Sequence, residues 1–86
     1  MANKKTYAYL KRMSHMFGGD IPLTKEEWQV ITDTMKGDTA IEAGNHCGSS
    51  SRTVEKWLEK LYDEVGARNK AHFVWHCAQP GNLYLA

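Results

Sequence analysis

The sequence has few of the residues that mark disulfide scaffolds, flexible linkers or membrane spans. Its 86 residues include only two Cys, two Pro and seven Gly. Cys47 and Cys77 form no CxxC pair, which argues against a disulfide framework and a zinc ribbon. No apolar run approaches the roughly 18 residues of a membrane span, and Met1 to Lys5 are not followed by the apolar stretch of a secretory signal. We therefore expect a cytoplasmic protein that makes no membrane contact and keeps both thiols reduced.

A surplus of charge of either sign is also missing. The net charge is +1, with 42% hydrophobic and 24% charged residues, as expected for one folded domain. Residues 1–22 carry four Lys or Arg against one Asp, a net +3, and residues 23–86 carry seven against nine acidic residues, a net −2. Composition alone therefore does not predict a tight phosphate binder.

Apolar spacing predicts a helix near the start of the chain. Tyr7, Leu10, Met13 and Phe17 recur at steps of three and four, and Gly18-Gly19 follows as a stop signal. These residues predict an N-terminal helix over 4–17, followed by a connection at 20–22.

Two capping boxes predict the next two helices. Thr24-Lys-Glu-Glu27 opens a helix that ends near Gly37, and Thr39-Ala-Ile-Glu42 opens a short one that is interrupted at Gly48. In each box the Thr hydroxyl and the Glu carboxylate satisfy exposed backbone N–H groups.

The most regular apolar pattern follows the serine triplet 49–51. It predicts an amphipathic helix of about four turns from Ser51 to Val65, closed by Gly66, with its buried face formed by Val54, Trp57, Leu58, Leu61, Tyr62 and Val65. A last helix is expected from near Asn69 to just before Pro80. Residues 82–86 carry no clear signal.

A short helix joined to a longer one by Cys47-Gly48-Ser49 indicates a helix-turn-helix. In that arrangement the second helix enters a DNA major groove and its outward residues read the site. The face opposite the apolar stripe carries Ser51, Arg52, Glu55, Lys56, Glu59 and Asp63.

From Leu23 to about Ala78 the chain resembles the LuxR/GerE-type (NarL/FixJ-like) helix-turn-helix domain of bacterial transcription regulators. The resemblance rests on landmarks that fall at the family spacing without a gap: Leu23-Thr24-x-x-Glu27 and Val30, Gly37, Thr39, Ser50-x-x-Thr53-Val54, Leu58, and Gly66-Ala67-Arg68-Asn69-Lys70.

The five predicted helices with their short connections indicate an all-α fold, and the resemblance implies that it is a LuxR/GerE-type four-helix helix-turn-helix domain with one extra N-terminal helix. The chain would divide into the N-terminal helix and connection (1–22), the helix-turn-helix domain (23–79) and a C-terminal tail (80–86). The resemblance further implies a stand-alone DNA-binding transcription regulator that is not an enzyme. It also implies a homodimer through the last helix, with Phe73, Val74, Trp75 and Cys77 at the interface.

The predicted DNA-binding residues form two groups. We expect Arg52, Glu55, Lys56 and Glu59 at base edges, and Thr39, Ser50, Thr53, Lys60, Arg68 and Lys70 at phosphates, with Ser51 and Asn69 beside them. Lys4, Lys5, Lys11 and Arg12 would add cations if the N-terminal helix packed beside the groove.

Departures from the family pattern leave an alternative open. The family usually has Lys where this chain has Glu55, which can either accept a hydrogen bond from cytosine or repel phosphates. Ala43-Gly44 replaces the usual Ile-Ala in the scaffold helix and leaves room near the turn. The alternative is an interaction protein of the same fold that modulates another regulator without binding DNA itself.

Neither a cofactor, a metal nor a catalytic set is expected. His72 and His76 are spaced for a shared metal and Cys77 is adjacent, but further ligands would have to come from His15, His46 or Cys47. The complete ligand spacing of a zinc site is missing.

Overall fold

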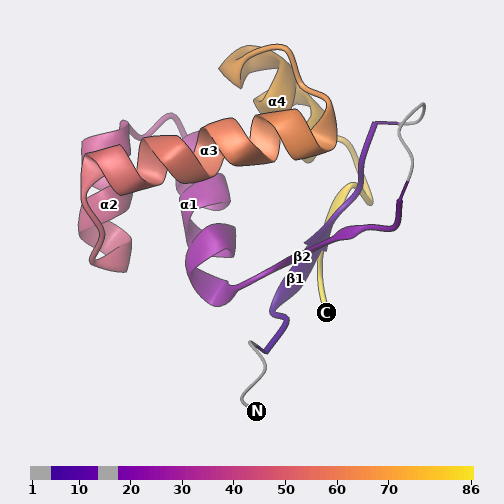
Figure 1. The fold of residues 1–86 in the computed structure, drawn as a ribbon, viewed down its shortest axis with the longest axis horizontal. Helices are drawn as coiled ribbons and strands as arrows, with labels where there is room; N and C mark the ends of the chain where they lie inside the picture. The colour runs from indigo at the N-terminus through magenta and orange to yellow at the C-terminus, as the bar shows by residue number, and fades with distance from the viewer. Residues whose placement is uncertain (1–4, 14–17) are drawn as a thin grey trace.

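The computed structural model describes residues 5–13 and 18–86, which form four helices and one small sheet. The chain begins with β1 (Ala8–Leu10) and β2 (Ile21–Leu23). Four helices follow: α1 (Lys25–Met35), α2 (Ala40–Cys47), α3 (Ser51–Val65) and α4 (Lys70–Ala78). The chain returns to the sheet as β3 (Leu83–Leu85). In Figure 1, α3 lies across the molecule, with α2 at its N-terminal end and the sheet beyond α1.

The expectation of an all-α fold is wrong, because the structure contains a three-stranded antiparallel sheet. Its order is β2-β1-β3, with Ala8 opposite both Leu23 and Leu85. The predicted N-terminal helix is replaced in the described residues by β1, and the predicted connection contributes β2. Phe17 and Lys4, which belonged to that predicted helix, lie outside the described residues.

Alternation of side chains explains why these short segments form strands. Ala8 and Leu10 of β1 are fully buried, whereas Tyr9 between them points to the outer face and stacks on Tyr84 at 5.5 Å. Pro22 sits opposite Tyr9 on the edge strand β2, where its missing N–H costs no interior hydrogen bond. The apolar inner face of the sheet thereby completes the core.

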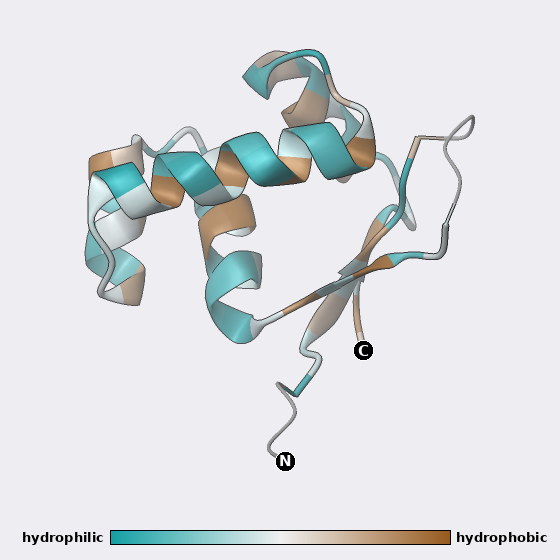
Figure 2. Cartoon of the chain, viewed as in Figure 1, coloured by the Kyte–Doolittle hydropathy of each residue, from teal (hydrophilic) through white to brown (hydrophobic). Residues whose placement is uncertain are grey.

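The core lies between the inner face of the sheet and helices α1, α3 and α4. Its largest fully buried side chains include Phe73, Leu10, Leu23, Ile31 and Val54. Phe73 of α4 packs against Tyr62 of α3, with ring centroids 4.9 Å apart. This packing fixes the apolar side of α3 and leaves its polar side toward the viewer in Figure 2.

The helix boundaries confirm the predicted caps. Both capping boxes are formed, at Thr24 and at Thr39, and Ser50 and Asn69 cap α3 and α4. Gly48 and Gly66 end α2 and α3 with left-handed backbone angles. The helical part of the chain therefore follows its local sequence signals closely.

Candidate nucleic-acid interface

Helices α2 and α3 form a helix-turn-helix, joined by Gly48, Ser49 and Ser50. Gly48 has a φ of 74°, a value that few side-chain-bearing residues adopt, so a glycine suits this turn. The N–H groups of Gly48 and Ser49 both donate to the carbonyl of Gly44 and close the end of α2.

Gly44 is the second glycine that this turn requires. A Cβ at this buried position would lie 2.4 Å from the carbonyl oxygen of Ser49. The sequence pattern Ala43-Gly44 therefore marks a close approach between α2 and the turn, and it leaves no spare room there.

The N-terminus of α3 is held by two hydroxyl groups. Ser50 Oγ accepts from the backbone N–H of Thr53 at 3.2 Å and lies 3.0 Å from Thr53 Oγ1. Ser50 is exposed and Thr53 is half-buried, so the capping role of the pair is compatible with a phosphate contact.

One face of α3 is uncovered by the rest of the described chain. The buried residues are Val54, Leu58, Leu61 and Val65, and the residues on the opposite side are all exposed: Arg52, Glu55, Lys56, Glu59, Lys60 and Asp63. No other described element lies in front of this face in Figure 2. We call these six residues the exposed face of α3.

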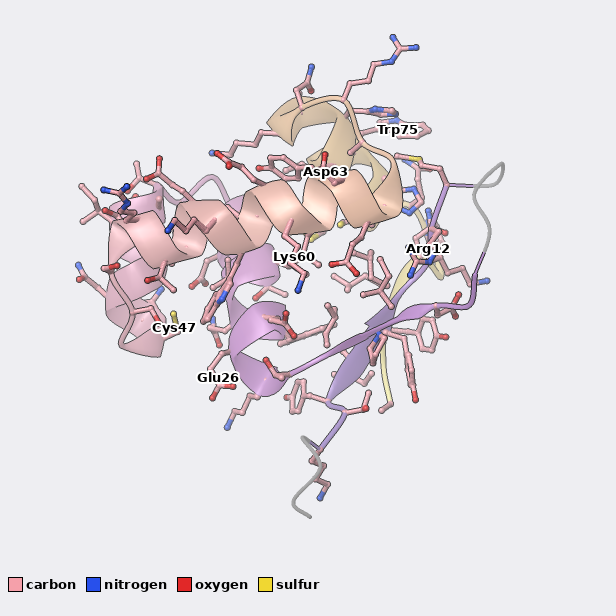
Figure 3. All side chains as sticks on the ribbon, in the orientation of Figure 1. Arg12, Glu26, Cys47, Lys60, Asp63 and Trp75 are labelled. Atoms are coloured by element: carbon pink, nitrogen blue, oxygen red, sulfur yellow. The ribbon has the colours of Figure 1, made fainter. Side chains whose placement is uncertain are left out.

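The exposed face carries two parallel rows of charge. Arg52, Lys56 and Lys60 repeat at i,i+4, and so do Glu55, Glu59 and Asp63, so each row follows one side of the helix. Figure 3 shows Lys60 and Asp63 extending from opposite edges of α3. Three cations and three carboxylates balance, and the face is neutral as a whole.

The acidic row borders a hollow next to α4. Thr39, Glu55, Glu59 and Lys70 line this hollow together, along with Asp38 and Tyr62. The structure thus brings two predicted phosphate ligands, Thr39 and Lys70, beside the two glutamates.

A second hollow lies between α3 and the N-terminus of α1. Trp57 of α3 lines it with Lys5, Lys25, Glu26 and Glu27, so two carboxylates balance the two ammonium groups there. Lys25 was not among the residues predicted from the sequence, because its position depends on how α1 packs.

Arg68 and Asn69 precede α4, and both are exposed. Asn69 Oδ1 accepts from the N–H of His72 at 2.9 Å, so Asn69 is a capping residue as well as a predicted contact. Ser51, the remaining predicted contact, is half-buried in the first turn of α3.

Two of the N-terminal cations lie far from the N-terminal half of α3. Arg12 Nη1 donates to the carbonyl of Glu64 at 2.7 Å and Nε donates to Gly19. Glu64 is twelve residues from Arg52 along α3, about 18 Å. The condition under which the N-terminal cations would extend the DNA-binding surface is not met, because β1 replaces the predicted helix in the described residues. Arg12 lies at the negative end of the α3 dipole instead.

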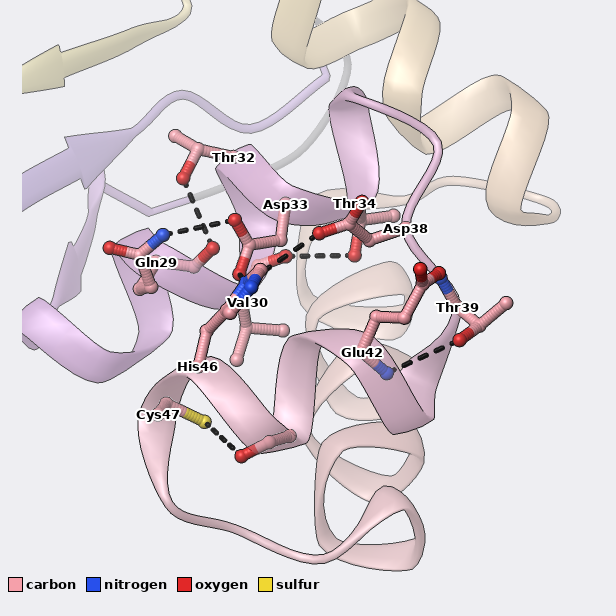
Figure 4. A network of polar contacts seen from close by, with 11 residues as sticks. Gln29, Val30, Thr32, Asp33, Thr34, Asp38, Thr39, Glu42, His46 and Cys47 are labelled. Carbon is pink, nitrogen blue, oxygen red and sulfur yellow. Dashed lines mark hydrogen bonds and ion pairs between the residues drawn. The ribbon is translucent and has the colours of Figure 1, made fainter.

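A polar network that the sequence analysis missed joins α1 to α2 (Figure 4). Asp33 is buried, and its Oδ2 lies 2.9 Å from His46 Nδ1. Its other oxygen, Oδ1, accepts a hydrogen bond from Gln29 Nε2 at 2.9 Å. The hydrogen bond and the charge of Asp33 raise the pKa of His46. Only the i,i+4 spacing of Gln29 and Asp33 was visible in the sequence, and it does not reveal the partner on α2.

The last helix offers less surface than predicted. Phe73 is fully buried and Cys77 is 4% exposed, so neither is available to a second copy, and burial raises the pKa of Cys77 to about 12. Val74 is half-buried, and Trp75 is 59% exposed. A dimer interface on α4 would therefore use Val74 and Trp75.

The histidines of α4 do not meet at one point. His76 is buried, with Nε2 2.6 Å from the carbonyl of Lys11, whereas His72 Nδ1 accepts from the N–H of Arg68. Each imidazole thus has its own backbone partner.

Comparison with protein-family models, with curated proteins and with solved structures finds no match to this chain. Among the residues that the structure describes, no helix is long and apolar enough to cross a membrane.

Proposed function

We propose that the protein binds double-stranded DNA by placing α3 in a major groove. The observation that carries the proposal is the exposed face of α3, a 15-residue helix held from behind by its buried residues and preceded by the tight turn from α2. A major groove about 12 Å wide accepts one helix of about 10–12 Å diameter.

The residues of the exposed face suit specific readout. Arg52 and Lys56 lie in the first two turns of α3, where a helix-turn-helix contacts base edges, and Arg pairs with guanine through two hydrogen bonds. Glu55 lies beside them in the acidic row and accepts from the amino group of cytosine in this proposal. Thr39, Ser50, Thr53 and Lys70 flank this end of α3 and contact phosphates.

The neutral charge of the exposed face predicts moderate affinity. Besides Arg52 and Lys56, which contact bases in this proposal, Lys60, Arg68 and Lys70 supply three exposed cations for phosphates, which gives a slope of about −3 for log affinity against log salt. The resemblance to bacterial regulators supports a role in transcription, in the cytoplasm, where the two free thiols stay reduced.

Fluorescence anisotropy with labelled duplexes, selected from a random pool, tests the proposal at two salt concentrations. Removing both side chains in Arg52→Ala/Lys56→Ala should weaken specific binding at least about tenfold, because each base contact contributes about 1–3 kcal/mol. A matched control, Lys11→Ala/Lys36→Ala, removes two exposed cations outside the exposed face and should bind within about twofold of the wild type. Equal losses in the two variants, or no duplex binding at low salt, would overturn the proposal.

A second candidate function is favoured by the balanced charge of the exposed face and by the exposed ring of Trp75. In this case the protein pairs with another regulator and does not bind DNA. Absence of duplex binding at low salt, together with saturable binding to a purified regulator that Trp75→Ala removes, would support this candidate over the first.

A further inference from the structure

Three metal-ligating side chains converge between α1 and α2. Asp33 of α1, Asp38 of the connection and His46 of α2 each offer one ligand atom, and these atoms lie within 4.8 Å of one another. We propose that this cluster, the α1–α2 triad, binds a divalent transition-metal ion of the zinc type. The inference is independent of the proposed DNA binding.

The distances within the triad suit a single ion. His46 Nδ1 is 2.9 Å from Asp33 Oδ2 and 3.6 Å from Asp38 Oδ2. Ligands of a tetrahedral ion with bonds of about 2.0–2.1 Å stand about 3.3 Å apart. The two separations from His46 lie on either side of this value, and the carboxylate oxygens of Asp33 and Asp38 lie within 4.8 Å of each other, close enough for one ion to bridge after side-chain movement.

The charge of the triad suits a divalent ion. Among the described residues, the ion pairs of Asp33 and Asp38 both go to His46. The two carboxylates together carry two negative charges, which a divalent ion balances. This balance is most important at Asp33, which is 2% exposed and therefore poorly solvated.

Neighbouring groups orient the ligands before any ion arrives. Gln29 donates to Oδ1 of Asp33 and leaves Oδ2 directed at His46, and the N–H of Asp38 donates to the carbonyl of Asp33 at 3.0 Å. Hydrogen bonds of this kind, from neighbouring groups to the ligand residues, fix the orientation of the ligands in metal sites. The Asp38 and His46 side chains are 25% and 56% exposed, which leaves room for water ligands and a path of entry.

The donor set selects the class of ion. One imidazole nitrogen and two carboxylate oxygens suit Zn²⁺ and Co²⁺, whereas Mg²⁺ and Ca²⁺ prefer oxygen ligands alone. Co²⁺ is the useful probe, because its visible absorption reports the number and type of its ligands.

The test is a titration of the chelator-treated full chain with Co²⁺ and Zn²⁺, followed by absorption and calorimetry. We expect one equivalent to bind and to raise the melting temperature, with Mg²⁺ binding at least about tenfold more weakly. Asp38→Asn keeps the pair between Asp33 and His46, so it should preserve the fold by circular dichroism while weakening Co²⁺ binding at least about tenfold.

Two matched controls separate the triad from unspecific binding. Asp63→Asn removes an exposed carboxylate of α3, and His72→Gln removes an imidazole of α4; both should leave Co²⁺ binding within about twofold of the wild type. The proposal fails if the wild type shows no saturable binding, if Asp38→Asn binds as tightly as the wild type, or if His72→Gln loses the ion.

Discussion

Replacing Gly44 by Ala tests whether the turn between α2 and α3 has the close packing described above. In an ordinary helix this change stabilises the fold by up to about 1 kcal/mol, because Ala is the better helix former. Here the new Cβ would lie 2.4 Å from the Ser49 carbonyl oxygen and 3.4 Å from the carbonyl carbons of Ser49 and Ser50.

The colliding atom belongs to the backbone and cannot rotate away. The N–H of Ser49 also donates to the carbonyl of Gly44 at 2.9 Å, which holds the two segments together. Overpacking of this kind costs about 1–3 kcal/mol. If the cost is about 3 kcal/mol and the gain in helix propensity is about 1 kcal/mol, the free energy of unfolding falls by about 2 kcal/mol. For a domain of this size the melting temperature should fall by about 8–16 °C.

Thermal and urea denaturation followed by circular dichroism measure this effect. Gly19→Ala is the matched control, because a Cβ at Gly19 meets no atom of the described residues within 4 Å and its backbone φ is not positive. The control should stay within about 0.5 kcal/mol of the wild type. A Gly44→Ala variant as stable as the wild type, or more stable, would refute the proposed close approach.

Three further predictions concern the core, the thiols and the α1–α2 network. Phe73→Ala should lower the free energy of unfolding by about 3–5 kcal/mol, measured by urea denaturation, because the ring is fully buried; a loss under about 1 kcal/mol would contradict this. At mildly alkaline pH an alkylating reagent should modify Cys47 and spare Cys77, whose burial raises its pKa to about 12; equal labelling by mass spectrometry would argue against this burial. With a chelator present, the contribution of the ion pair between His46 and Asp33 to stability should be complete below the ordinary pKa of 6.5 and should disappear as the pH rises through the raised pKa of His46, since only the protonated imidazole makes an ion pair. The free energy of unfolding of His46→Gln, measured by urea denaturation across this pH range, should not show that loss. Identical pH profiles for the wild type and His46→Gln would show that the pair does not stabilise the fold.

The helices could be predicted from the sequence because their signals are local. The capping boxes at Thr24 and Thr39 and the glycines at 48 and 66 each act within one turn of helix, and the structure confirms all four.

The sheet could not be predicted because its partners are distant in sequence. Ala8 pairs with Leu85, and three residues per strand are too few to distinguish period two from a helical period. Tyr7, Leu10 and Met13 fit a helix by spacing alone, although Leu10 in fact completes the inner face of a strand. Because β1 replaces the predicted N-terminal helix, Arg12 lies at the C-terminal end of α3 and not where that helix would have placed it.

From periodicity alone, the candidate surface could be predicted only along α3 itself. The apolar periodicity predicted which residues between Arg52 and Lys60 are exposed, because helix geometry determines which residues lie opposite the buried stripe. Contributions from other elements, such as Lys25 beside Trp57 and the partner of Asp33, depend on packing between helices and have no signature in the sequence.

Amide chemical shifts of the isotopically labelled protein, recorded as a selected duplex is added, test the central claim most directly. The account predicts that the largest changes fall on the first half of α3, with smaller ones at Thr39 and Lys70. Changes confined to the sheet or to the surface around Trp75, with α3 unaffected, would contradict it.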